Sequence, residues 1–269
     1  MKPASEEDPI SHETVIRRFT PSLVTVLVLA YLLTAVWIGM WLRRFAPIYD
    51  LSPDSKDTVK QAMGLVTTMS ALVLGLLVDS TKSFYDRNRT RTLETVSKFA
   101  LLHRMLTIYG PQAAEVRGDL HALIEGETQR LWPDDAHATA RTKSQDQKGN
   151  AFYGALLSLE ARDDTQRTLK AQAASLALDI GQLLSLMEAE STTSISKPML
   201  TVVVLWLVQI FLGFSVIAPP TATATFALIA SALCAAGAIF LILELDDPFS
   251  GLIRISSEPM RKVLGQLGK

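Results

Sequence analysis

Four long apolar segments alternate with polar stretches along the chain. They cover about residues 22–42, 62–78, 199–217 and 223–243. Each is close to the roughly 20 residues that a helix needs to cross the hydrocarbon core of a bilayer. Only a short connector around Pro219 and Pro220 separates the last two segments, so we expect them to form an antiparallel hairpin. The pattern predicts four transmembrane helices.

The long polar stretch at 79–197 has apolar positions at helical spacing and no strand alternation. We expect the second span to continue as a helix to about residue 108, followed by helices near 112–131, 150–161 and 164–190, with a polar loop at 132–149. The predicted buried face of the continued second span consists of Phe84, Leu93, Val96, Ala100, Met105 and Ile108. That of the helix near 112–131 consists of Val116, Leu120, Leu123 and Ile124. The fold class is therefore an all-α membrane protein with four transmembrane helices and a helical domain inserted between spans two and three.

This organisation predicts five parts. They are an N-terminal segment (1–21), a first transmembrane pair (22–78), the helical domain (79–197), a transmembrane hairpin (198–244) and a tail (245–269). Lys and Arg residues gather after the second span and in the tail, which places both termini and the helical domain in the cytoplasm. Arg43 and Arg44, at the end of the first span, are the exception to this charge rule.

The second span carries two stripes at helical spacing. Gly64, Thr68, Ala71 and Gly75 form a small, weakly polar stripe, and Leu65, Met69, Leu72 and Leu76 form an apolar one. In a symmetric oligomer one stripe could line a pore, where an apolar ring gates by dewetting. The alternative is ordinary close packing of helices through small residues. At the end of the span, a ring of Asp79 side chains would favour cations, but pairing with Lys82 three residues later is the preferred interpretation.

Three carboxylates, Glu244, Asp246 and Asp247, end the last span just before Pro248. Negative charge is unfavourable at a helix C-terminus because it meets the negative end of the helix dipole. The cluster could bind a hard cation such as Ca²⁺, which prefers oxygen ligands. A clamp is the preferred interpretation, in which Arg254, Lys82 and Arg87 pair with these carboxylates and join the tail to the second span.

Composition narrows the function classes. The net charge is −1, which gives no indication of a nucleic-acid partner, and the single cysteine, Cys234, excludes an intramolecular disulfide. The four histidines lack metal-ligand spacing, and there is no nucleophile elbow or phosphate loop. We therefore expect no enzyme, no catalytic residue, no metal site and no cofactor, apart from the Ca²⁺ alternative above.

Several motifs resemble those of bacterial membrane proteins with a bestrophin-like domain of unassigned function. The motifs are AIFLILELDDPFSGLIRISS at 238–257, the stretch 214–219, Gly75-Leu76-Leu77 with Lys82 and Tyr85-Asp86, Tyr109-Gly110-Pro111 and Leu131-Trp132-Pro133. The resemblance covers most of residues 65–260. One departure is Pro220-Thr221, where the family is expected to carry a more polar, often basic pair.

The wider similarity is to bestrophins, pentameric anion channels in animals with bacterial relatives that can pass cations. The resemblance implies four spans with both termini cytoplasmic, a pore lined by the second span, and an acidic Pro-Phe sequence that contributes to a calcium clasp in the animal proteins. We therefore expect an oligomeric ion channel of the bacterial inner membrane, with a pentamer favoured, whose partners are the lipid bilayer and inorganic ions. The alternative is a non-conducting scaffold or sensor whose helical domain binds a cytoplasmic partner.

Overall fold

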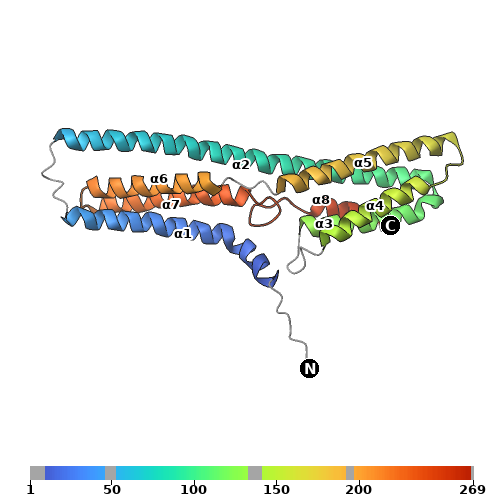
Figure 1. The fold of residues 1–269 in the computed structure, drawn as a ribbon, viewed down its shortest axis with the longest axis horizontal. Helices are drawn as coiled ribbons and strands as arrows, with labels where there is room; N and C mark the ends of the chain where they lie inside the picture. Colours follow the sequence, from blue (N-terminus) through green and yellow to red (C-terminus); the bar gives the residue numbers. More distant parts are fainter. Residues whose placement is uncertain (1–9, 46–52, 133–140, 192–196, 268–269) are drawn as a thin grey trace, which may run out of the picture. The chain divides into compact units, whose positions relative to one another are not determined.

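The computed structural model describes residues 10–45, 53–132, 141–191 and 197–267, and within these ranges every regular element is a helix. In chain order these are α1 (Ile10–Phe45), α2 (Pro53–Tyr109), the 3₁₀ helix η2 (Pro111–Ala113), α3 (Ala114–Leu131), α4 (Arg141–Ser158), α5 (Asp164–Ser191), α6 (Lys197–Ile217), α7 (Ala222–Leu245) and α8 (Glu258–Leu267), as labelled in Figure 1. The predicted all-α fold class is confirmed.

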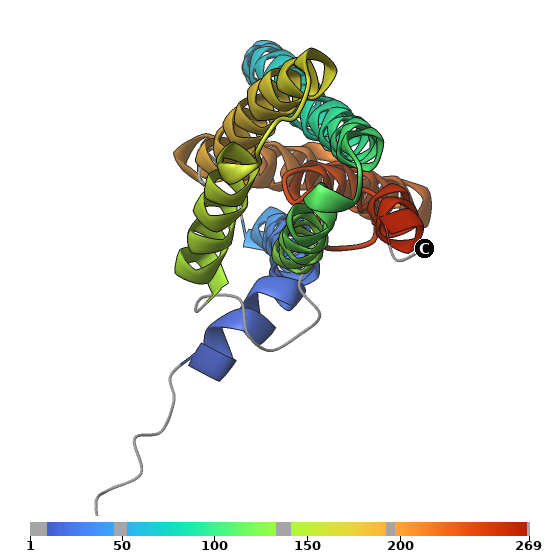
Figure 2. The same cartoon turned by 90° about the vertical axis from the view of Figure 1, so that its right-hand side faces the viewer.

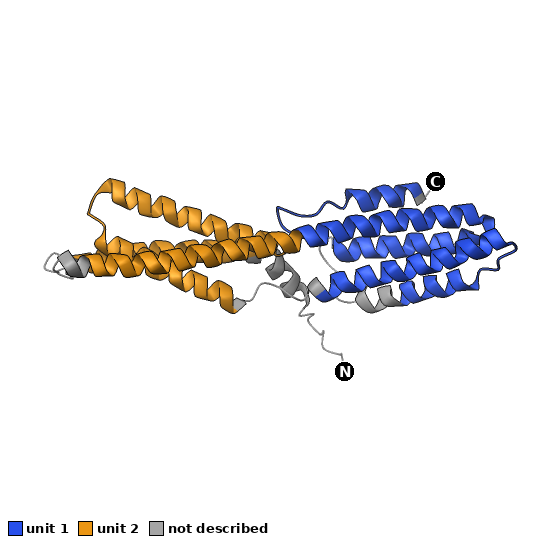
Figure 3. Cartoon of the chain, turned by 90° about the horizontal axis from the view of Figure 1, so that it is seen from above, with its two compact units in different colours: residues 1–15, 86–193, 248–269 blue, residues 16–85, 194–247 orange. Residues whose placement is uncertain are grey.

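The chain divides into two compact units (Figure 3). The helical unit comprises Met1–Val15, Asp86–Thr193 and Pro248–Lys269, and the transmembrane unit comprises Ile16–Tyr85 and Ser194–Asp247. The boundary lies inside α2, which contributes residues to both units.

Among the described residues, four helices are long and apolar enough to cross a membrane. The spans are Pro21–Arg43 in α1, part of Asp57–Tyr109 in α2, Pro198–Ile217 in α6 and Ala222–Leu245 in α7. The predicted four spans are therefore confirmed. The hydroxyl of Thr221 accepts a hydrogen bond from the Ala224 N–H at 3.3 Å, which caps the first turn of α7 after the short connector.

The interior of the transmembrane unit is made by one apolar face from each span. Its buried residues are Val28, Leu32, Ala35, Val36, Leu77, Val203, Leu207, Phe211, Ala232, Ile239 and Ile242. α6 packs along α7, as the hairpin prediction requires. Many large apolar side chains on the outer faces of these helices remain exposed, as expected of helices that contact lipid or another chain.

The helical unit is a bundle whose members are seen end-on in Figure 2. α4 packs against α3 and α5, and α8 packs against α3. α2 ends at Tyr109. The next residue, Gly110, has a φ of 112°, which is readily accessible only to glycine, and Pro111 then begins η2. The predicted buried face of α3 is confirmed, since Val116, Leu120, Leu123 and Ile124 are all buried.

The predicted apolar face of the second half of α2, after residue 79, is partly wrong. Leu93 and Ile108 are exposed, whereas the buried positions are Val96, Phe99, Leu102, Leu106 and Tyr109. This half of α2 carries apolar residues on more than one side, so spacing alone did not single out the face that α3 and α5 cover.

Two helix starts and one additional helix also differ from the predictions. α1 begins at Ile10, inside the predicted N-terminal segment, and α8 in the tail was not predicted. α4 begins at Arg141, because Arg, Lys and Gln are good helix formers even in a polar stretch. The rest of the predicted 132–149 loop, at 133–140, lies outside the described residues, and this part includes Pro133.

Candidate functional site

The predicted pore residues lie together along one stretch of α2. All of them are exposed in the single chain: Gly64, Thr68, Ala71, Leu72, Gly75, Leu76 and Asp79. A Cβ atom added at Gly64 or Gly75 would meet open space. The Thr68 hydroxyl donates to the Gly64 carbonyl at 2.9 Å, which satisfies it within the helix. Within the described part of the chain, the small stripe of α2 therefore packs against no other helix.

Other glycines bring the spans into close contact. A Cβ atom at Gly39 of α1 would lie 2.8 Å from the Leu212 carbonyl oxygen of α6 and would collide with Ser215. At Gly213 of α6, it would meet the end of the Met63 side chain of α2 at 2.7 Å. The sequence contained a signal for the first contact, since Ala35 and Gly39 are small residues four apart.

The acidic cluster lies at the end of α7. Glu244 is buried, with 3% of its surface exposed, while Asp246 and Asp247 are half-buried. The Asp246 N–H donates to the Ile242 carbonyl at 3.2 Å, which closes the last turn of the helix. The side chains of Lys82, Arg87 and Arg254 are exposed, and their pairing with the carboxylates stays a prediction.

The structure gives no support to the alternative that the acidic cluster binds Ca²⁺ through its side chains. Among the residues that the structure describes, no group of three or more His, Cys, Asp or Glu side chains is arranged to hold a metal ion.

The Pro-Phe turn after the cluster is held by contacts that the sequence did not reveal. The Ile255 N–H donates to the Pro248 carbonyl at 2.8 Å, and Gly251 has a φ of 79° within this turn. The Trp132 indole N–H donates to the Ile255 carbonyl at 2.8 Å. The Trp132 and Phe249 rings meet edge to face, with centroids 5.6 Å apart. The turn is thereby fixed to the end of α3.

A second candidate site is a cavity of about 1,030 Å³ inside the helical unit, between α2, α3, α4 and α5. Most of its wall is apolar, with contributions from Phe99, Leu102, Leu123, Phe152 and Leu184. The sequence did not indicate it, because its residues come from four separate helices.

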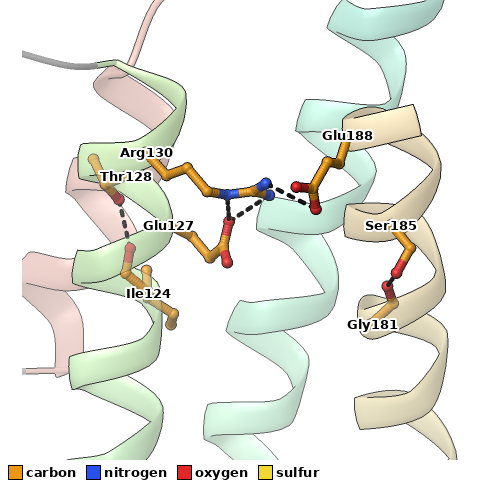
Figure 4. Close-up of polar contacts among 7 residues, drawn as sticks. All are labelled: Ile124, Glu127, Thr128, Arg130, Gly181, Ser185 and Glu188. Carbon is orange, nitrogen blue, oxygen red and sulfur yellow. Dashed lines mark hydrogen bonds and ion pairs between the residues drawn. The ribbon is translucent and has the colours of Figure 1, made fainter. Parts of the chain in front are cut away.

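Arg130 bridges two carboxylates at the wall of this cavity (Figure 4). Two of its guanidinium nitrogens lie 2.8 Å from Oε2 of Glu127, and Nη1 lies 3.4 Å from Oε2 of Glu188. The Glu127 side chain is 6% exposed, so the ion pair compensates a buried charge. The contact ties α3 to α5.

Comparison of the sequence with models of known protein families assigns the chain to a family. The model of the bestrophin-like domain matches residues 29–260. The chain belongs to the bestrophin-like family. The match begins inside the first span, covers the other three spans and residues 86–193 of the helical unit, and ends at the start of α8, so it covers both candidate sites. The family that the sequence motifs indicated is thereby confirmed.

Solved structures of bestrophin homologues share this fold. A crystal structure of a mutant bestrophin homologue from Klebsiella pneumoniae covers 91% of this chain and 99% of its own, with a TM-score of 0.69 and 13% identity. Another from the same organism, solved by zinc phasing, covers 90% of this chain and 95% of its own, with a TM-score of 0.65 and 14% identity. At this identity the likeness establishes the fold alone. No curated protein matches the chain.

Proposed function

We propose that the protein is an oligomeric ion channel of the bacterial inner membrane whose pore is lined by α2. The observation that carries this proposal is the exposed stripe of Gly64, Thr68, Ala71 and Gly75. Small residues usually serve close helix packing in membranes, and here no other helix among the described residues packs against them. Membership in the bestrophin-like family supports the same function.

The chemistry of α2 suits a narrow ion path. Small side chains at Gly64, Ala71 and Gly75 leave room around an axis, and the Thr68 hydroxyl adds a polar group. The exposed Leu72 and Leu76 offer an apolar ring of the kind that gates by dewetting. Asp79, one turn further along, would add a ring of negative charge that favours cations.

The assembly and orientation complete this proposal. By similarity to bestrophins, copies of the chain surround the axis, with a pentamer favoured. The concentration of Lys and Arg after the second span and in the tail supports cytoplasmic termini and a cytoplasmic helical unit. In this arrangement Glu244, Asp246 and Asp247 clamp the tail through Arg254, Lys82 and Arg87.

Cysteine substitution on α2 tests the pore assignment. The native Cys234 would first be changed to Ser, which leaves no other thiol in the chain. Thr68→Cys or Ala71→Cys would then be reconstituted in liposomes and treated with a charged thiol reagent. We expect ion flux before treatment and a loss of most of that flux afterwards. The matched control is Leu205→Cys on α6, which is 60% exposed and should be insensitive.

A second function has one specific observation in its favour. The cavity of about 1,030 Å³ in the helical unit could receive a small molecule or a partner side chain, as a scaffold or sensor requires. For a non-conducting scaffold, a charged substitution such as Ala71→Lys would affect folding alone. If liposomes that contain correctly assembled wild-type protein show no ion flux, the channel hypothesis is rejected and the scaffold or sensor function is favoured.

A further inference from the structure

A second cavity, of about 610 Å³, lies in the transmembrane unit where α1 ends and the α6–α7 hairpin turns. Its wall combines two cations, Arg43 and Lys60, with residues that are otherwise apolar. The apolar part consists of Phe214, Val216, Ile217, Ala218, Pro219, Ala224, Ala227 and Leu228. A pocket of this kind suits a ligand with one anionic end and one apolar end.

Arg43 is fixed in position yet keeps most of its donors. Its Nη1 donates to the Ala218 carbonyl at 2.6 Å, which anchors the side chain to the hairpin connector. A guanidinium carries five N–H donors, so the remaining ones can bind a ligand oxygen. Among the residues that the structure describes, no carboxylate forms an ion pair with Arg43, so its charge has no counter-ion there.

Lys60 adds a second positive charge to the same cavity. Its Nζ lies 3.4 Å from Oδ1 of Asp57, one turn earlier in α2, and both side chains are more than half exposed. Exposed pairs of this kind contribute little and exchange readily with water. The ammonium can therefore turn toward an anion in the cavity.

The position of the cavity along the spans indicates its surroundings. Arg43 is the last residue of the first span, Ile217 is the last of the third, and Ala222 is the first of the fourth. These three span ends place the cavity at a boundary between hydrocarbon and water, where lipid phosphates lie. Cations at this depth can pair with lipid phosphates, and charge-assisted hydrogen bonds from Arg to phosphate are strong.

We propose that this cavity binds an anionic phospholipid. The phosphodiester lies between Arg43 and Lys60, where the planar guanidinium can donate two parallel hydrogen bonds to phosphate oxygens. One acyl chain follows the apolar wall at Phe214 and Leu228. The apolar wall favours a phospholipid over a free phosphate, and the two cations favour an anionic headgroup over a zwitterionic one. None of its lining residues belongs to the exposed stripe of α2, although Lys60 lies one turn before Gly64, and the proposal does not depend on ion conduction.

Lipid competition on the full chain tests the proposal. Protein purified in a neutral detergent would be titrated with phosphatidylglycerol or with phosphatidylcholine of identical acyl chains. Native mass spectrometry would count the retained lipids, and thermal unfolding would report stabilisation. We expect preferential retention of phosphatidylglycerol, reduced about fivefold when either cation is removed, as Lys60→Gln or Arg43→Gln.

The control removes an equal charge elsewhere. Lys262→Gln on α8 takes away a Lys side chain that is 70% exposed, and it should leave lipid retention unchanged. Because Arg43 also holds the hairpin connector, its variant could lower stability by itself. Lys60 makes only an exposed pair, so Lys60→Gln decides the outcome if Arg43→Gln fails to fold.

Three results would overturn the proposal. Equal retention of phosphatidylcholine would show a general lipid surface. Equal thermal protection by inorganic phosphate alone would show a free-anion site. Unchanged retention in Lys60→Gln would show that the lipid binds elsewhere.

Discussion

At the scale of single residues, the glycines of the spans have opposite roles. Gly39 lies where the backbones of α1 and α6 come close, and a Cβ atom there would meet the backbone of Leu212. Gly64 and Gly75 lie where a Cβ atom would meet nothing. Residue type alone does not distinguish the two roles, because the neighbouring helix decides them.

Gly39→Ala should destabilise the transmembrane unit. The added methyl group meets a backbone oxygen that can yield only if α1 and α6 separate, and overpacking of this kind costs about 1–3 kcal/mol. The unfolding of the purified protein in mixed detergent micelles would measure the loss.

The matched control for this prediction is Gly237→Ala in α7, where the methyl group enters open space. Gly213→Ala should lie between the two, since the end of the flexible Met63 side chain can move aside. An equal loss of stability at Gly39 and Gly237 would contradict the close approach of α1 and α6.

Arg130→Met should destabilise the helical unit by roughly 3 kcal/mol, because the change removes the cation that faces the buried Glu127 carboxylate. The double variant Arg130→Met with Glu127→Gln should recover part of this loss, since the buried charge is then also absent. Chemical denaturation of the full chain would measure both variants.

An exposed pair provides the comparison for this prediction. Arg167→Met removes the partner of Asp164, and both side chains of that pair are largely exposed. Its loss should stay below about 1 kcal/mol. If both substitutions cost the same, the Arg130 pair is less buried than the structure shows.

At the scale of elements, the tail is held to the helical unit by two different kinds of contact. Met260 and Val263 of α8 enter the core that α3 also lines, while Trp132 bonds the backbone of the turn before α8. The apolar contacts follow from the helical spacing of the two residues. The indole hydrogen bond depends on how the turn folds, so no pattern in the sequence indicates it.

Trp132→Phe should loosen the turn without removing its aromatic contact. The change deletes the N–H that donates to the Ile255 carbonyl and keeps a ring near Phe249. We expect a loss of about 1–3 kcal/mol in the local stability of the tail, because the buried carbonyl loses its donor. Limited proteolysis with trypsin would report faster cleavage at Arg254 and Arg261. Unchanged cleavage would show that the packing of α8 alone holds the tail.

At the scale of the whole molecule, the spans carry large exposed apolar faces. Leu65, Met69, Leu72 and Leu76 on α2 are all more than half exposed. Lipid can cover such a face, and so can other copies of the chain. In the proposed channel, α2 faces the axis and other copies stand beside it.

Ala71→Cys in a Cys234→Ser background should form disulfide-linked dimers under mild oxidation, because copies of α2 would surround one axis. A short bifunctional thiol reagent should give the same product, seen as a slower band in a denaturing gel. Phe226→Cys on α7 is the control, since its side chain is 74% exposed and lies on a different span. Efficient cross-linking at 226 and none at 71 would place α7 rather than α2 at the centre.

The sequence by itself determined the helical class, the four spans, the bestrophin-like family and the buried face of α3, because hydrophobic length, periodicity and short motifs are local properties of the chain. Tertiary structure alone decided which glycines pack helices, which face of α2 is covered after residue 86, and how Arg130 and Trp132 join distant helices. It also formed both cavities. These features depend on which segments meet in space, and a pattern along one segment does not encode its partner.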